Sequence, residues 1–169
     1  TVWHLNEGHA GFVVLQRIRD LIEQGKSFDT ALQEVRQTTM FTTHTPVPAG
    51  HDAFPFSLVE THLAGAWGTL GGYRDAFLAL GQYDNGSGSL FNMTALALRA
   101  AGTVNAVSQL HGQVTRQMWG PIWGNVPDDQ RPVRRDCGSQ RRDPRAIGLR
   151  FQEFAAELQY QRSVHFSPV

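Results

Sequence analysis

Apolar positions in the first part of the chain alternate between short runs and helical stripes. The run from Val2 to Leu5 is typical of a buried strand that is already under way. Apolar residues then recur at helical spacing from Ala10 to Ile22, and Gly25 ends this stripe in the manner of a C-terminal cap. The pattern predicts a second, shorter helix from Phe28 to Val35, with Ser27 as its N-cap.

A second strand and a stiff loop follow. Thr38 to Thr43 is short and rich in β-branched and aromatic residues, which indicates a buried strand. Thr45 to Gly50 contains two closely spaced prolines, which cannot continue a sheet ladder and which restrict the backbone. His44 therefore lies where the predicted strand gives way to the loop.

The middle of the chain has a mainly helical pattern. Val59 to Leu70 predicts a third helix, and Ala76 to Leu80 predicts a short fourth one. Asp84 to Ser89 is a polar surface turn, whereas Met93 to Ala101 is an apolar run of good helix formers. Val107 to Met118 has the spacing of an amphipathic helix. Short strands that alternate with helices predict a helix-rich α/β fold.

Composition narrows the class of protein. The 169 residues are enough for one domain with a core, and 15 basic residues balance 15 acidic ones, so no net field draws nucleic acid or an anionic membrane. No apolar stretch approaches the roughly 20 residues of a membrane span. The single cysteine, Cys137, excludes an intrachain disulfide and favours a reducing compartment, so we expect a cytoplasmic protein. Because Thr1 opens a strand already under way, we expect the chain to begin inside a longer protein.

Residues 134–169 differ in character from the rest of the chain. They are rich in arginine and lack apolar periodicity, so we expect a disordered tail in which Phe151 to Leu158 forms one helix. The same arginines raise a lower-ranked hypothesis, in which Arg131 to Arg150 binds nucleic acid.

Seven histidines invite a metal hypothesis. His4 and His9 do not have the spacing of helical zinc ligands, but His44, His51 and Asp52 share a stiff loop and could chelate by proximity. His44 could instead satisfy backbone groups at the strand end. Its flanking threonines and fixed loop also suit hydroxyl-rich ligands such as sugars. We favour sugar recognition and predict no metal site.

Glu7 and His9 flank a glycine at the predicted strand-to-helix turn. Free backbone N–H groups at such a turn favour the oxygen atoms of a ligand. The alternative is a plain helix start, with Asn6 as the cap and Glu7 complementing the helix dipole. The spacing alone leaves both interpretations open.

Three segments of the chain carry a family resemblance. They are HLNEGHAGF from His4, FTTHTPVPAGHDAF from Phe41, and FNMTALALRAAGTVNAVSQLHGQVTRQMW from Phe91. In this order they resemble the α-glucan (glycogen or maltodextrin) phosphorylases in their bacterial form. The resemblance runs from Thr1 to about Val133.

The resemblance implies a fold and an activity. Residues 1–133 correspond to a fragment of the N-terminal Rossmann-like domain, which forms one half of a two-domain glycosyltransferase cleft, and residues 134–169 are a tail foreign to the family. Intact members transfer glucosyl units from α-1,4-glucan to inorganic phosphate and use pyridoxal phosphate. The lysine that carries this cofactor is absent from the chain, and Lys26 does not match it. We therefore expect the chain alone to be inactive.

The resemblance also implies site residues. His44 matches a histidine that binds the glucosyl 6-hydroxyl and whose carbonyl faces the charge that develops during catalysis. Glu7 and His9 match residues that line the same substrate cleft. Ala106 departs from the family, which usually has glycine there. We expect some apolar side chains to pack against parts of the enzyme absent from this chain: Trp67, Trp119, Trp123 and the apolar strand at Val2.

The implied partners are α-1,4-glucan, inorganic phosphate, the remainder of a phosphorylase chain and a second copy in a homo-oligomer. The alternative function is a non-catalytic carbohydrate-binding module or a pseudoenzyme fragment.

Overall fold

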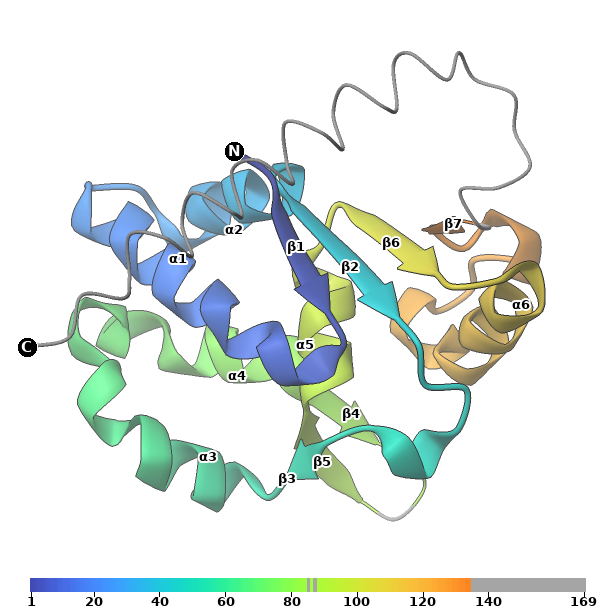
Figure 1. Ribbon diagram of the computed structural model, residues 1–169. Helices are drawn as coiled ribbons and strands as arrows, with labels where there is room; N and C mark the ends of the chain where they lie inside the picture. The colour runs from blue at the N-terminus through green and yellow to red at the C-terminus, as the bar shows by residue number, and fades with distance from the viewer. Residues whose placement is uncertain (85, 87, 135–169) are drawn as a thin grey trace, which may run out of the picture. The chain divides into compact units, whose positions relative to one another are not determined.

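Parallel strands form the main sheet of the chain. This computed structural model describes residues 1–84, 86 and 88–134, and within them the main sheet has four strands in the order β1-β2-β6-β7. Their bounds are Trp3–Asn6 for β1, Thr39–Thr43 for β2, Thr103–Ala106 for β6 and Val133–Arg134 for β7. Each neighbouring pair is parallel, so the carboxyl ends of the strands meet at one edge (Figure 1).

Helices connect these strands. The α-helices of the described residues are α1 Val13–Glu23, α2 Phe28–Gln37, α3 Phe56–Leu63, α4 Arg74–Gly81, α5 Met93–Ala100 and α6 Gln109–Met118. The 3-10 helices are η1 Gly8–Phe12, η2 Pro48–Gly50, η3 Ala64–Ala66, η4 Gly68–Tyr73, η5 Gly120–Trp123 and η6 Asp128–Gln130. Local side chains fix where some of them begin: the Ser27 hydroxyl accepts from the Thr30 N–H at 3.3 Å, as the sequence predicts.

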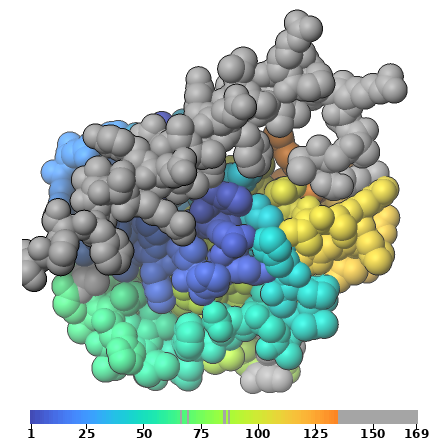
Figure 2. Space-filling view, viewed as in Figure 1, coloured from blue at the N-terminus to red at the C-terminus, as the bar shows by residue number. Residues whose placement is uncertain are grey.

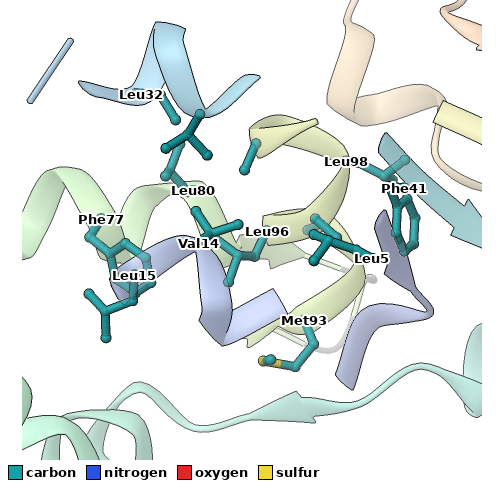
Figure 3. Packing of buried hydrophobic residues seen from close by; sticks show 14 of the residues in the cluster. Leu5, Val14, Leu15, Leu32, Phe41, Phe77, Leu80, Met93, Leu96 and Leu98 are labelled. Carbon is teal, nitrogen blue, oxygen red and sulfur yellow. The ribbon is translucent and has the colours of Figure 1, made fainter. Parts of the chain in front are cut away.

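Helix α5 lies at the centre of the core. Of its eight residues only Arg99 is not buried, and a helix that is apolar on all sides must be covered on all sides. Figure 3 shows side chains of β1, β2, α1, α2 and α4 gathered around it. Leu96, on this helix, is fully buried. Helix α5 therefore packs against strands β1 and β2 of the sheet and against helices α1, α2 and α4.

A second, smaller sheet follows the loop after β2. It has three antiparallel strands in the order β3-β5-β4, with bounds Ala53–Phe54, Ser89–Asn92 and Gln82–Asp84. The Met93 N–H donates to the Asp52 carbonyl at 3.0 Å, and the Asn92 amide oxygen accepts from the Thr94 and Ala95 N–H groups. The small sheet thus fixes the far end of the loop against the start of α5.

The predicted fold class is confirmed, since the structure is a helix-rich α/β arrangement with a parallel sheet that fits part of a Rossmann-like domain. Two expectations are wrong. The helix predicted for Val59 to Leu70 ends as an α-helix at Leu63, because glycines interrupt the rest and Gly68 has a positive φ of 36°. Trp119 is not left uncovered: it is 2 % exposed and belongs to the core.

The arginine-rich segment beyond residue 134, with its predicted helix from Phe151 to Leu158, lies outside the described residues. The domain boundary near residue 133 remains a prediction. None of the helices in the described ranges has both the length and the apolar character needed to cross a bilayer.

Candidate functional site

The carboxyl ends of β1 and β2 bring the two histidine-bearing segments together. Asn6 pairs with Thr42 across the two strands, and the Glu7 N–H donates to the Thr42 carbonyl at 2.9 Å. On the face drawn in Figure 2, the dark blue N-terminal segment adjoins the cyan segment of β2, which continues into the turquoise loop. The crevice at this edge of an open parallel sheet is where ligands usually bind.

Glu7 holds the start of the loop by its carboxylate. Its Oε1 accepts hydrogen bonds from the His44 N–H and, at 3.2 Å, from the Thr45 hydroxyl. The Glu7 backbone has φ 70° and ψ 166°, a conformation found almost only in glycine. It is the only non-glycine residue with positive φ among the described residues. Backbone strain is therefore concentrated where the two segments meet.

Asn6 holds the His44 side chain. The His44 Nε2 lies 2.7 Å from the Asn6 Oδ1, while the imidazole stays exposed. The alternative in which Asn6 caps a helix is wrong, because the N-cap position of η1 is Glu7 and no side chain caps it. His44 is thus held through both its backbone N–H and its ring.

His9 lies one step further along the turn, in η1, and is exposed. No hydrogen bond joins it to Glu7 or His44 in the described part of the chain. The structure therefore brings Glu7 and His44 into direct contact and leaves His9 as a separate, accessible side chain on the same turn.

Gly8 allows the turn to approach α5. A Cβ atom at this position would lie 2.6 Å from the Thr94 Oγ1 and 3.0 Å from the Thr94 N, closer than atoms pack. Gly8 is buried, so such an atom could not turn toward solvent. The close approach holds the turn that follows Glu7 against the start of α5, and no local sequence pattern signals it.

His51 anchors the other end of the loop and is 8 % exposed. Its Nδ1 lies 2.9 Å from the Thr94 Oγ1, and its ring meets the Trp119 ring edge-on with 4.9 Å between centroids. Sequence reasoning missed Thr94 and Trp119 as supports, because both partners are remote from the loop in the sequence. The segment from Thr45 to His51 is thus fixed at both ends.

A concavity of about 290 Å³ lies beside this loop. Pro48, His51, Tyr83 and Trp119 contribute to its lining. It is open to solvent and carries both aromatic rings and polar atoms, which are the two kinds of group that bind a sugar ring.

Burial lowers the pKa of two imidazoles near the site. Loss of solvent is the main cause for His51, with nearby Glu7 and Asp52 acting in the opposite direction. The pKa of His4 is lowered by burial and, to a lesser degree, by His44. The structure therefore favours the uncharged form of both rings.

The two loop histidines that could chelate a metal by proximity lie in different surroundings. His51 is turned inward to Thr94 and Trp119, whereas His44 is exposed and bonded to Asn6. Within the described residues no group of three or more His, Cys, Asp or Glu side chains is placed to hold a metal ion.

The chain's single lysine lies away from the turn that carries Glu7 and the loop that carries His44. Lys26 lies between α1 and α2 and pairs with Glu34. Because α1 leads from the carboxyl end of β1 back toward the amino end of the sheet, Lys26 is remote from Glu7 and His44.

The chain is 52% identical over 132 residues to the maltodextrin phosphorylase of Thermococcus litoralis, covering 78% of the chain and 15% of that protein. It is 45% identical over 139 residues to the glycogen phosphorylase of Mycobacterium tuberculosis, covering 78% of the chain and 16% of that protein. The glycogen phosphorylase of Aquifex aeolicus is 36% identical over 117 residues, which cover 69% of the chain and 17% of the relative. No protein-family model matches the chain.

Proposed function

The chain belongs to the α-glucan phosphorylase family, and from this premise we propose that its Glu7 turn and His44 loop form one wall of a groove that binds α-1,4-glucan. The chain spans about one sixth of the length of the relatives it matches. We therefore propose glucosyl transfer only for a complete enzyme that contains this segment.

One observation carries this proposal: a carboxylate and an amide from the end of β1 hold an exposed imidazole at the end of β2. The Glu7 Oε1 accepts from the His44 N–H, and the Asn6 Oδ1 meets the ring Nε2. A ring fixed in this way loses little freedom when it binds a hydroxyl group, and hydroxyl groups are what an uncharged sugar offers.

In a complete enzyme we propose transfer of a glucosyl unit from the glucan to inorganic phosphate. His44 would bind a hydroxyl of the transferred sugar through its imidazole. Its carbonyl would face the positive charge that develops at the anomeric carbon, where a fixed dipole stabilises the transition state. Glu7 would hold the His44 backbone in place for this role, and His9 would add a further polar contact with the substrate.

The cofactor and the phosphate-binding groups that the reaction also needs would come from other segments of the enzyme. We propose that pyridoxal phosphate and the groups that bind inorganic phosphate are supplied by residues absent from this chain, because its single lysine, Lys26, lies between α1 and α2 and not at the turn of Glu7 or the loop of His44. The chain alone would then bind glucan without cleaving it. A cytoplasmic location and assembly with further phosphorylase segments or with a second copy complete the proposal; the single cysteine supports the location.

The second candidate function is a non-catalytic carbohydrate-binding module. The observation that favours it is that the loop is anchored at both ends, by Glu7 and by His51, within the described residues themselves. Mixing the chain with a phosphorylase from which the corresponding segment has been deleted, together with glucan, phosphate and pyridoxal phosphate, separates the two. Release of glucose 1-phosphate that requires the added chain would support its role in an active enzyme, and glucan binding by the chain without such release would support the module.

The direct test of glucan binding is a titration of the ¹⁵N-labelled chain with maltoheptaose, followed by amide chemical shifts. We expect saturable changes at Glu7, His9 and His44, and no comparable change with cellohexaose, whose linkages are β. His44→Ala should abolish the changes. The control His62→Ala removes another exposed histidine, on α3, and should leave them intact. Shifts that map elsewhere, or equal responses to both sugars, would contradict the proposal.

A further inference from the structure

The contact between Asn6 and His44 determines which ring nitrogen carries the proton. The His44 Nε2 lies 2.7 Å from the Asn6 Oδ1. An amide oxygen only accepts hydrogen bonds, so Nε2 must be the donor and must hold the hydrogen. In the neutral ring the other nitrogen, Nδ1, is then a lone-pair acceptor.

The surroundings leave that acceptor available. His44 is exposed, and its Nδ1 has no hydrogen-bond partner within the residues that the structure describes. Glu7 and Thr45 occupy the backbone side of the residue, because the Glu7 carboxylate accepts from the His44 N–H and the Thr45 hydroxyl. The ring is therefore held through its Nε2, and no described residue takes up the lone pair of its Nδ1.

We propose that Asn6 is a positioning residue, which fixes His44 in the tautomer with Nε2 protonated and so makes the site selective for ligand groups that donate a hydrogen bond. The ligand part of this proposal rests on the proposed function, since it concerns the sugar hydroxyl that meets His44. That hydroxyl donates to Nδ1. An ether or carbonyl oxygen at the same place would bring its own lone pair against the lone pair of the His44 Nδ1, and the repulsion would exclude such a ligand.

The test uses the ligand-free chain. Long-range ¹H–¹⁵N spectra of the ¹⁵N-labelled protein report which nitrogen of each histidine carries hydrogen, and side-chain couplings report the rotamer. We expect His44 to be protonated at Nε2 in a single rotamer. Asn6→Asp keeps an acceptor-only oxygen beside Nε2 and should preserve both properties.

Asn6→Leu removes the acceptor and should lower the population of the bound rotamer and tautomer about fivefold, the effect of one lost hydrogen bond. Asn125→Leu makes the same exchange at an exposed asparagine in the loop after η5 and should change neither. Protonation of His44 at Nδ1 in the unchanged chain would overturn the proposal. An Asn6→Leu variant that folds normally and shows an unchanged tautomer and rotamer of His44 would also overturn it.

A sugar titration separates this inference from the proposed function. If maltoheptaose fails to bind while His44 shows the expected tautomer, the glucan assignment fails and the positioning role of Asn6 stands. If maltoheptaose binds but its 6-O-methyl derivative binds equally well, the selectivity for donors is overturned while glucan recognition stands.

Discussion

Replacement of Glu7 by glycine and by alanine should reverse the usual order of stability of these two residues. At an ordinary position, glycine is about 0.5–1 kcal/mol less stable than alanine, because its unfolded backbone is freer. Glu7 instead has φ 70° and ψ 166°, where a side chain costs about 1–3 kcal/mol. Alanine keeps this strain and glycine removes it. The difference leaves Glu7→Gly more stable than Glu7→Ala by about 1 kcal/mol.

Both variants lose the carboxylate that accepts from the His44 N–H and the Thr45 hydroxyl. Hydrogen bonds to a charged group contribute about 1.5–3 kcal/mol, and less where the group is partly exposed, as Glu7 is. We therefore expect Glu7→Ala to be less stable than the unchanged chain, because it loses these hydrogen bonds and keeps the strain, whereas in Glu7→Gly the relief of strain offsets part of the loss.

The assay is urea unfolding followed by tryptophan fluorescence, with the free energy of unfolding extrapolated to water. The matched control is Gln33→Gly against Gln33→Ala, at an exposed position inside α2, where the alanine variant should be the more stable. Equal stability of the two Glu7 variants, or a more stable alanine variant, would refute the strain at this turn.

The remaining predictions concern the supports of the site. Gly8→Ala should destabilise the chain by about 1–3 kcal/mol, because its Cβ would meet the Thr94 Oγ1 at 2.6 Å; a urea midpoint equal to that of the unchanged chain would contradict the close packing. Leu96→Ala should cost about 2–5 kcal/mol by opening a cavity beside a fully buried position, and a loss below about 1 kcal/mol would show that α5 is not central. Burial lowers the pKa of His51 below its ordinary value of 6.5. The unfolded chain therefore binds a proton at this imidazole more readily than the folded chain does. The contribution of the neutral His51 to the free energy of unfolding is complete above pH 6.5 and is lost as the pH falls below that value. Urea unfolding at pH 7.5 and 5.5 checks this, and His51→Gln should reduce the pH dependence; a variant with undiminished pH dependence would exclude His51 as its source.

The class of fold could be predicted from the sequence because its longest signals are local. The stripe of α1, the Ser27 cap of α2 and the β-branched run of β2 each depend on residues close together in the chain. The meeting of Glu7 with His44 was accessible as well, as both follow parallel strands whose carboxyl ends share an edge.

Other parts had no local signal. Strand β3 spans only Ala53–Phe54, which is too short for an alternating pattern, and β6 spans only Thr103–Ala106, with Val104 and Ala106 as its two buried positions. Each exists because it pairs with a distant strand: β6 with β2, and β3 with β5. Their stability therefore comes from tertiary contacts that a window of sequence does not contain.

The supports of the site were missed for the same reason. Thr94 lies 43 residues from His51 in the sequence, and Trp119 reaches the same imidazole from the end of α6. Asn6 has the residue type of a helix cap, and only the register of β1 against β2 places its amide beside the His44 ring. Side chains at strand ends can be assigned to a site from sequence, but their mutual hydrogen bonds cannot.

The most direct measurement of the central claim is a crystal structure of the chain with maltoheptaose bound. The account predicts a glucosyl hydroxyl within about 2.6–3.2 Å of the His44 Nδ1, with the sugar lying over the turn that carries Glu7 and His9. A maltoheptaose molecule bound on another face, with the His44 ring still open to solvent, would contradict it.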